Sequence, residues 1–125
     1  MSNPVAALRR VRDGDTEYDH LWFVCPGCKT QGDDSTGMHA LPVTGHPNAV
    51  PVKGAPKVPM WTFDGNLESP TLAPSILSRG GRTPNFVCHS FLRGGVFEYL
   101  GDCSHKFANQ RVPMEPLPDW FLKEG

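Results

Sequence analysis

The sequence Cys25-Pro26-Gly27-Cys28 restricts the fold of this chain more than any other feature. Two cysteines separated by a Pro-Gly pair form a tight turn, or knuckle, that directs both sulfurs toward one point, and thiolates hold Zn²⁺ at about 2.3 Å. The alternative is a redox pair, but a thioredoxin-like site belongs in a βαβ unit, and no helical pattern follows Cys28. The spacing therefore predicts a zinc site with Cys25 and Cys28 as ligands.

The composition predicts a small β-rich domain with a thin core. Gly and Pro each number 13 among 125 residues, and 38% of residues are hydrophobic, which favours turns over long helices. A thin core usually needs disulfides or a metal, and paired cysteines in a reducing cytosol are more often metal ligands. We predict a mainly β fold in a single zinc-binding domain over residues 1–125, with residues 1–15 and 114–125 peripheral.

The sequence also bounds the location and the partners. No window approaches the roughly 20 apolar residues that span a bilayer, and the N-terminus lacks the apolar stretch of a secretory signal. The formal net charge of −1 offers no general attraction to phosphate backbones. We expect a cytoplasmic protein, in the host cytoplasm if a phage encodes it, that binds no nucleic acid and no membrane. Its oligomeric state is open.

Strand patterns and loops organise the chain. The aromatic and β-branched run from Tyr18 to Val24 predicts a strand that ends at the knuckle. Residues 85–92 and 96–100 predict a β-hairpin with an X-Gly turn. Residues 42–58 predict a long irregular surface loop in which His46 is exposed. The predicted fold thus combines a zinc-ribbon-like knuckle, a β-hairpin and long irregular loops.

Prolines decide the expectations for two other segments. Pro70 and Pro74 argue against a central strand over residues 60–77, because proline cannot donate to a sheet ladder. The prolines between residues 112 and 120 favour an extended path across the surface. Trp120 and Phe121 are expected to pin the end of this tail to the body of the domain.

A structural zinc site needs two ligands besides the knuckle. The possible donors are His39, Cys88, His89, Cys103 and His105. His39 follows the knuckle after a short loop. If Cys88 lies opposite Tyr99 in the hairpin, Cys103 sits about 13 Å further along, at roughly 3.3 Å per residue, and needs a bend to reach it. The preferred set is Cys25, Cys28, His39 and Cys88; the alternatives are a four-cysteine site with Cys103 and a surface role for His39.

A hydroxyl, two imidazoles and a carboxylate lie outside this ligand set. Neighbouring strand residues point to opposite faces, so His89 points away from the metal if Cys88 faces it. In acyl-transfer sites a serine attacks a carbonyl, a neutral histidine takes its proton and a carboxylate fixes the histidine tautomer. Ser75, either His89 or His105, and Asp102 could fill these roles. Most chains of this length contain these residue types, so the inventory is not specific.

Several short motifs together resemble a known family. In chain order they are CPGC, His39, WTFDGN at 61–66, PTLAPS at 70–75, CHSF at 88–91 and DCSH at 102–105. Over roughly residues 20–115 they resemble a small family of phages and bacteria classified as a domain of unknown function. Some members carry the label ammonia monooxygenase, which this chain contradicts because that activity implies membrane-embedded copper chemistry. Others are linked to bacterial ubiquitin-like conjugation operons.

The resemblance implies a peptidase that trims or releases the ubiquitin-like modifier. It places Ser75, His89, Asp102 and His105 at motif positions and implies Cys25, Cys28, His39 and Cys88 as the ligands. In the family it resembles, many relatives have serine where this chain has Cys103, and this departure weakens the four-cysteine alternative.

Three hypotheses for the function follow from these residues, and a serine hydrolase is the preferred one. We predict a zinc-stabilised hydrolase, a serine-type peptidase or isopeptidase acting on a ubiquitin-like or peptide substrate. Ser75 is the nucleophile, a histidine the base and Asp102 the orienting group. The contrasting hypothesis is a non-catalytic zinc-ribbon-like module that binds a protein partner, as a phage or bacterial accessory or inhibitor protein. A catalytic zinc would instead need an open coordination position that holds water.

Overall fold

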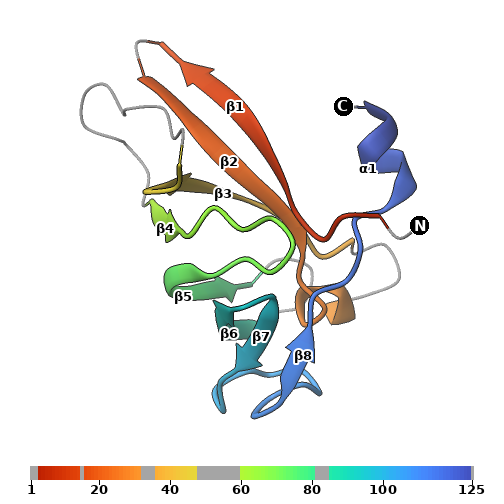
Figure 1. Ribbon diagram of the computed structural model, residues 1–125. Helices are drawn as coiled ribbons and strands as arrows, with labels where there is room; N and C mark the ends of the chain where they lie inside the picture. Colours follow the sequence, from red (N-terminus) through yellow and green to blue (C-terminus); the bar gives the residue numbers. More distant parts are fainter. Residues whose placement is uncertain (1–2, 15, 32–35, 48–59, 81–84, 125) are drawn as a thin grey trace.

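A computed structural model describes residues 3–14, 16–31, 36–47, 60–80 and 85–124 (Figure 1). Its described part confirms a mainly β fold, because eight strands form one sheet whose strand order follows the chain. The strands are β1 (Ala7–Asp13), β2 (Thr16–Val24), β3 (Met38–Thr44), β4 (Trp61–Phe63), β5 (Leu72–Arg79), β6 (Val87–Arg93), β7 (Val96–Tyr99) and β8 (Arg111–Pro113). The short helices are the 3₁₀ helix η1 (Cys28–Gln31) and α1 (Asp119–Glu124).

Strand β2 leads into the knuckle, as the sequence predicts. It ends at Val24, and β3 returns antiparallel to it so that Phe23 pairs with His39 and Val24 with Met38. Cys25 N–H donates to the carbonyl of Gly37 at 2.7 Å, which extends this pairing by one step. The pairing therefore brings His39 back to the knuckle.

The predicted hairpin is present as β6 and β7, but its register differs. Gly94 and Gly95 form the turn with φ of 55° and 77°, and Arg93 pairs with Val96. Two residues with positive φ are the requirement of a type I′ turn, which glycine meets without steric cost. Ser90 therefore lies opposite Tyr99, and the predicted pairing of Cys88 with Tyr99 is wrong by two residues.

The expectation that prolines exclude a central strand is wrong for β5. This strand contains Pro74 and lies between β4 and β6. The register shifts between the pairs Leu72↔Leu92 and Ile76↔Ser90, so three residues of β5 face one residue of β6. Such a bulge accommodates proline within a sheet and re-aims nearby side chains. Ser75 lies in this bulge.

The main core lies on one face of the sheet and includes the cysteines. Phe23, Phe63, Leu92 and Phe97 are almost completely buried there. Cys25, Cys28, Cys88 and Cys103 belong to the same cluster. Four of the fifteen buried residues of this cluster are therefore cysteines.

The C-terminal tail packs beside the N-terminus (Figure 1). Leu117 N–H donates to the carbonyl of Pro4 at 2.8 Å, and Leu117 and Phe121 are buried against Val24 in a second cluster. Phe121 pins the tail as expected. Trp120 is 49% exposed and does not, because the tail ends in helix α1, which turns neighbouring side chains in different directions.

The expectation that His46 is exposed is also wrong. Its side chain is buried, and its Nε2 lies 2.8 Å from Oδ2 of Asp19, which is buried as well. The predicted loop begins too early, since residues 42–44 belong to β3, and its residues 48–58 lie outside the described residues. No helix in the described part of the chain is long and apolar enough to cross a membrane.

Candidate active site and metal centre

Ser75, His89 and Asp102 form a continuous hydrogen-bonded chain. Nε2 of His89 lies 3.0 Å from Oγ of Ser75, and Nδ1 of His89 lies 3.0 Å from Oδ2 of Asp102. A carboxylate only accepts, so Nδ1 carries the proton and Nε2 is free to accept from the serine hydroxyl. This is the arrangement in which a histidine activates a serine nucleophile and a carboxylate fixes the histidine tautomer.

The pleat and the bulge place Ser75 beside His89. Along β6, Cys88 and Ser90 are buried whereas His89 between them is only partly buried, so His89 points to the opposite face from Cys88. Leu77 pairs with His89, and Ser75 lies two residues before Leu77 on the same face. The predicted separation of Cys88 from His89 is thus present in the structure.

Asp102 comes from the turn that follows β7. Its side chain is 53% exposed and that of His89 is 24% exposed, so the chain of groups is open to a substrate from outside. The turn is fastened to β6 on both sides, because Leu100 N–H donates to the carbonyl of His89 and Ser104 N–H donates to the carbonyl of Val87, both at 2.9 Å. These bonds hold the carboxylate next to His89.

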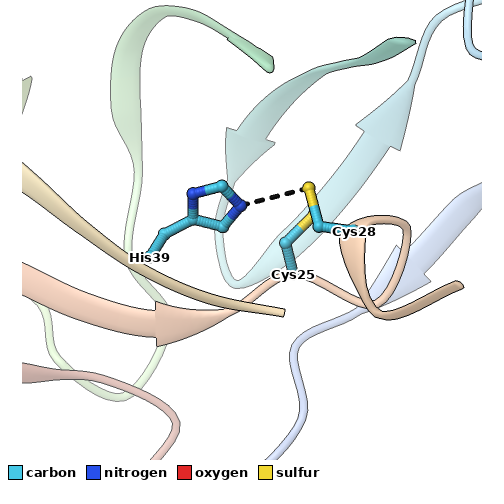
Figure 2. Close-up of side chains that lie close together, drawn as sticks. All are labelled: Cys25, Cys28 and His39. Atoms are coloured by element: carbon cyan, nitrogen blue, oxygen red, sulfur yellow. Dashed lines mark hydrogen bonds between the residues drawn. The ribbon is translucent and has the colours of Figure 1, made fainter. Parts of the chain in front are cut away.

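Cys25, Cys28 and His39 gather on the other face. Their donor atoms lie within 4.8 Å of one another, which makes them a group that could hold a metal ion. Figure 2 shows the His39 ring pointing at the two cysteines of the knuckle, with its Nε2 3.1 Å from Sγ of Cys28. The ring also stacks on Phe23, with 5.6 Å between centroids, and this contact helps to orient it.

Cys88 lies beside this group. Its Sγ is 3.6 Å from Sγ of Cys25. Two thiolates on one tetrahedral Zn²⁺ at about 2.3 Å have sulfurs about 3.8 Å apart. Cys25, Cys28 and His39 form the group whose donor atoms could share one ion, and Cys88 lies next to Cys25 but outside that group of three. Thiols and imidazoles are the usual donors of structural zinc, so the chemistry of these side chains fits this ion.

The electrostatics of the cluster favour a cation. Hydrogen bonds from the thiols of Cys28 and Cys88 lower the pKa of Cys25. Burial alone would lower the pKa of His39, but its hydrogen bonds to Cys25 and Cys28 and their negative charge raise it to about 10. Hydrogen bonding to Cys25 and Cys28 raises the pKa of Cys88. A thiolate at Cys25 is thus stabilised by a neighbouring positive charge, which a bound metal ion would also supply.

Residues 4–100 match the family model described as bacterial ubiquitination-like system serine protease (BubE). The chain belongs to this family. The resemblance to proteins of ubiquitin-like conjugation operons is therefore confirmed. No curated protein and no solved structure matches the chain. Within this BubE-family chain, Ser75, His89 and the four preferred metal donors lie inside the matched range, while Asp102, Cys103 and His105 lie beyond it.

In this BubE-family member, His105 lies beside Cys88 and the candidate metal group rather than beside Ser75. Its Nε2 lies 3.3 Å from Sγ of Cys88, and burial lowers its pKa. The His105 ring also meets the ring of Tyr99 edge-on, with 4.9 Å between centroids. Among the described contacts, His89 is the histidine that joins Ser75 and Asp102.

Tyr99 is a residue of the centre that the sequence reasoning missed. Its hydroxyl accepts from Gly27 N–H at 2.9 Å and lies 3.3 Å from Sγ of Cys25. A Cβ on Gly27 would collide with the His105 ring and approach Tyr99 to 3.0 Å, so the knuckle needs glycine at this position. The alternation of β7 could have indicated that Tyr99 faces the same side as Phe97.

Cys103 lies near neither sulfur of the knuckle among the described contacts. Its thiol contacts the backbone of His89 instead, 3.2 Å from the nitrogen and 3.2 Å from the oxygen. Of these two cysteines, Cys88 is therefore the one whose sulfur contacts the knuckle, 3.6 Å from Sγ of Cys25.

Proposed function

We propose that this chain is a metal-stabilised serine peptidase or isopeptidase that acts on a ubiquitin-like or peptide substrate. The observation that carries the proposal is the Ser75–His89–Asp102 chain, with both hydrogen bonds at 3.0 Å. The family description, a serine protease of a bacterial ubiquitination-like system, supports the same reaction and a protein as the substrate. Under this proposal the family's chemistry resides on β5, β6 and the turn after β7.

The geometry supports a two-step acyl transfer. Ser75 Oγ attacks the scissile carbonyl while its proton passes to Nε2 of His89, and Asp102 stabilises the resulting imidazolium through Nδ1–H. Collapse of the tetrahedral intermediate breaks the C–N bond, and His89 returns the proton to the departing amine. Water then attacks the acyl-enzyme as it gives a proton to His89, and His89 passes that proton to Ser75 Oγ as the ester bond breaks and the acid product leaves.

Zn²⁺ is the metal we propose for the cluster, held by Cys25, Cys28, His39 and Cys88. Bound there, the ion would cross-link the knuckle, β3 and β6. These four side chains would fill a tetrahedral shell, as in structural rather than catalytic zinc sites. Cys88 and His89 face opposite sides of β6, which also favours a structural ion that is separate from the reacting groups.

Cleavage of a ubiquitin-like protein fused through its C-terminus to a reporter tests the proposal. We expect the zinc-loaded chain to release the reporter and Ser75→Ala to abolish release. Ser78→Ala is the matched control, because Ser78 lies on the same strand but is an odd number of residues away and faces the other side. Equal release by the parent and Ser75→Ala would contradict a serine mechanism. A folded parent that cleaves nothing yet binds the fusion would favour a non-catalytic binding module.

A further inference from the structure

Cys103 contacts both polar backbone groups of the proposed catalytic histidine. His89 N–H donates to Sγ of Cys103 at 3.2 Å, and the Cys103 thiol donates to the carbonyl oxygen of His89 at 3.2 Å. Cys103 is only 8% exposed, so water does not compete freely for these groups. The Cys103 side chain thus contacts both the amide nitrogen and the carbonyl oxygen of His89, the residue that must hold Ser75 and Asp102 in line.

This contact lies just beyond the last residue pair between β6 and β7. Strand β7 ends at Tyr99, which pairs with Ser90, so the earlier residues of β6 extend past it. The backbone groups exposed there still need partners. Ser104 supplies them at Val87, accepting its N–H at Oγ and donating to its carbonyl, both at 2.9 Å. At His89 the Cys103 sulfur accepts the N–H, and its thiol is a second donor to the carbonyl, which also accepts from Leu100 N–H at 2.9 Å.

The carboxylate of Asp102 depends on this attachment. Its side chain is half-exposed, and among the described residues its hydrogen-bond partner is His89. An exposed side chain retains many rotamers, so burial does not fix its direction. The direction of the Asp102 side chain instead depends on where its backbone is held. Cys103 is the next residue along that backbone.

We propose that Cys103 is a positioning residue that holds Asp102 and the His89 backbone in register, a role that rests on the proposed serine mechanism. Two substitutions separate its hydrogen bonds from its bulk. Cys103→Val fills a similar volume without a donor or acceptor, whereas Cys103→Ser keeps a hydroxyl that can donate and accept. Because the sulfur lies outside the proposed ligand set, both variants should retain the metal content of the parent.

The experiment measures the rate at which a fluorophosphonate probe labels the zinc-loaded chain. We expect Cys103→Val to lower this rate roughly tenfold to a hundredfold, the range that misplaced catalytic groups produce, and Cys103→Ser to restore it to within about threefold of the parent. In an Asp102→Ala background, Cys103→Val should lower the labelling rate little further, because the carboxylate that Cys103 positions is already absent. A merely structural role would give the same loss in both backgrounds.

A second readout does not depend on activity. The ¹⁵N shifts of the His89 ring report which nitrogen carries the proton, and the parent should show it on Nδ1. Cys103→Val should move the ring toward a mixture of tautomers and Cys103→Ser should not; Cys103→Ala replaces the valine variant if that one fails to fold. Unchanged tautomer and unchanged rate in the valine or alanine variant would overturn the proposal. A parent that never labels would overturn the serine mechanism instead, while the tautomer comparison would still decide whether Cys103 positions His89.

Discussion

Cys88 and His89 are neighbours on β6 but belong to different sites on opposite faces of the sheet. Sγ of Cys88 lies 3.6 Å from Sγ of Cys25, whereas Nε2 of His89 lies 3.0 Å from Oγ of Ser75. A metal ion on one face would therefore hold the strand that presents the proposed base on the other. The two faces are thus physically joined through β6 and chemically distinct.

Substitution of the two histidines should separate the sites. His89→Ala removes the proposed base, and we expect fluorophosphonate labelling to fall by roughly 10²–10⁴-fold with the metal content unchanged. His105→Ala removes the imidazole next to Cys88, and we expect metal affinity to fall roughly 10–100-fold, as for other groups that support a ligand. Labelling of the zinc-saturated His105 variant should stay near the parent rate. The opposite pattern would make His105 the base.

Removal of the metal should unfold the domain and stop the reaction together. The proposed ligands come from the knuckle, β3 and β6, so loss of the ion would free three segments of a thin core. Circular dichroism and labelling, followed during titration with a chelator, should change in parallel. Loss of labelling from a domain that stays folded would instead indicate an ion that takes part in catalysis.

Tyr99→Phe should destabilise the knuckle although Tyr99 is not itself a proposed metal ligand. The change removes the hydroxyl that accepts from Gly27 N–H, and an unsatisfied buried N–H costs about 1–3 kcal/mol. We expect the free energy of unfolding in urea to fall by about that amount and the zinc-loaded variant to label at the parent rate. A stability equal to the parent would show that another group satisfies Gly27.

Phe121→Ala should destabilise the domain at a distance from the reacting groups. Phe121 is buried against Val24 and Leu117, and deletion of a buried phenylalanine side chain costs about 3–5 kcal/mol. Trp120→Ala is the matched control, since Trp120 is half-exposed on the same helix and should change stability by no more than about 0.5 kcal/mol. Urea unfolding measures both. Equal losses would mean that α1 packs differently.

Features that depend on local pattern could be predicted from the sequence. The alternation along β6 was enough to separate Cys88 from His89, and the knuckle spacing identified Cys25 and Cys28. The position of Ser75 was not predictable, because it depends on a bulge that the register with β6 produces around Pro74. Proline excludes a central strand only if the strand keeps a regular hydrogen-bond ladder, and the bulge in β5 interrupts that ladder.

Residues that meet through long-range packing were also missed or misplaced. His46 was expected in solvent but pairs with Asp19 on β2, and its ring also lies 5.3 Å from that of Phe63 on β4, so its burial depends on contacts distant in sequence. By residue type alone, His105 could serve as the catalytic base as well as His89 could. Only the path of the chain after β7 distinguishes it from His89, since that path carries Asp102 to one face and His105 to the other.

The most direct test of Ser75 as the nucleophile is to locate the fluorophosphonate adduct. The zinc-loaded chain would be treated with the probe, digested and mapped by mass spectrometry, with Ser75→Ala and Ser78→Ala treated in the same way. If Ser75 is the nucleophile, we expect one adduct, on Ser75, which is absent from Ser75→Ala and present in Ser78→Ala. An adduct on another residue, or no adduct on a folded chain with its metal bound, would contradict the assignment of Ser75, His89 and Asp102 as the reacting groups.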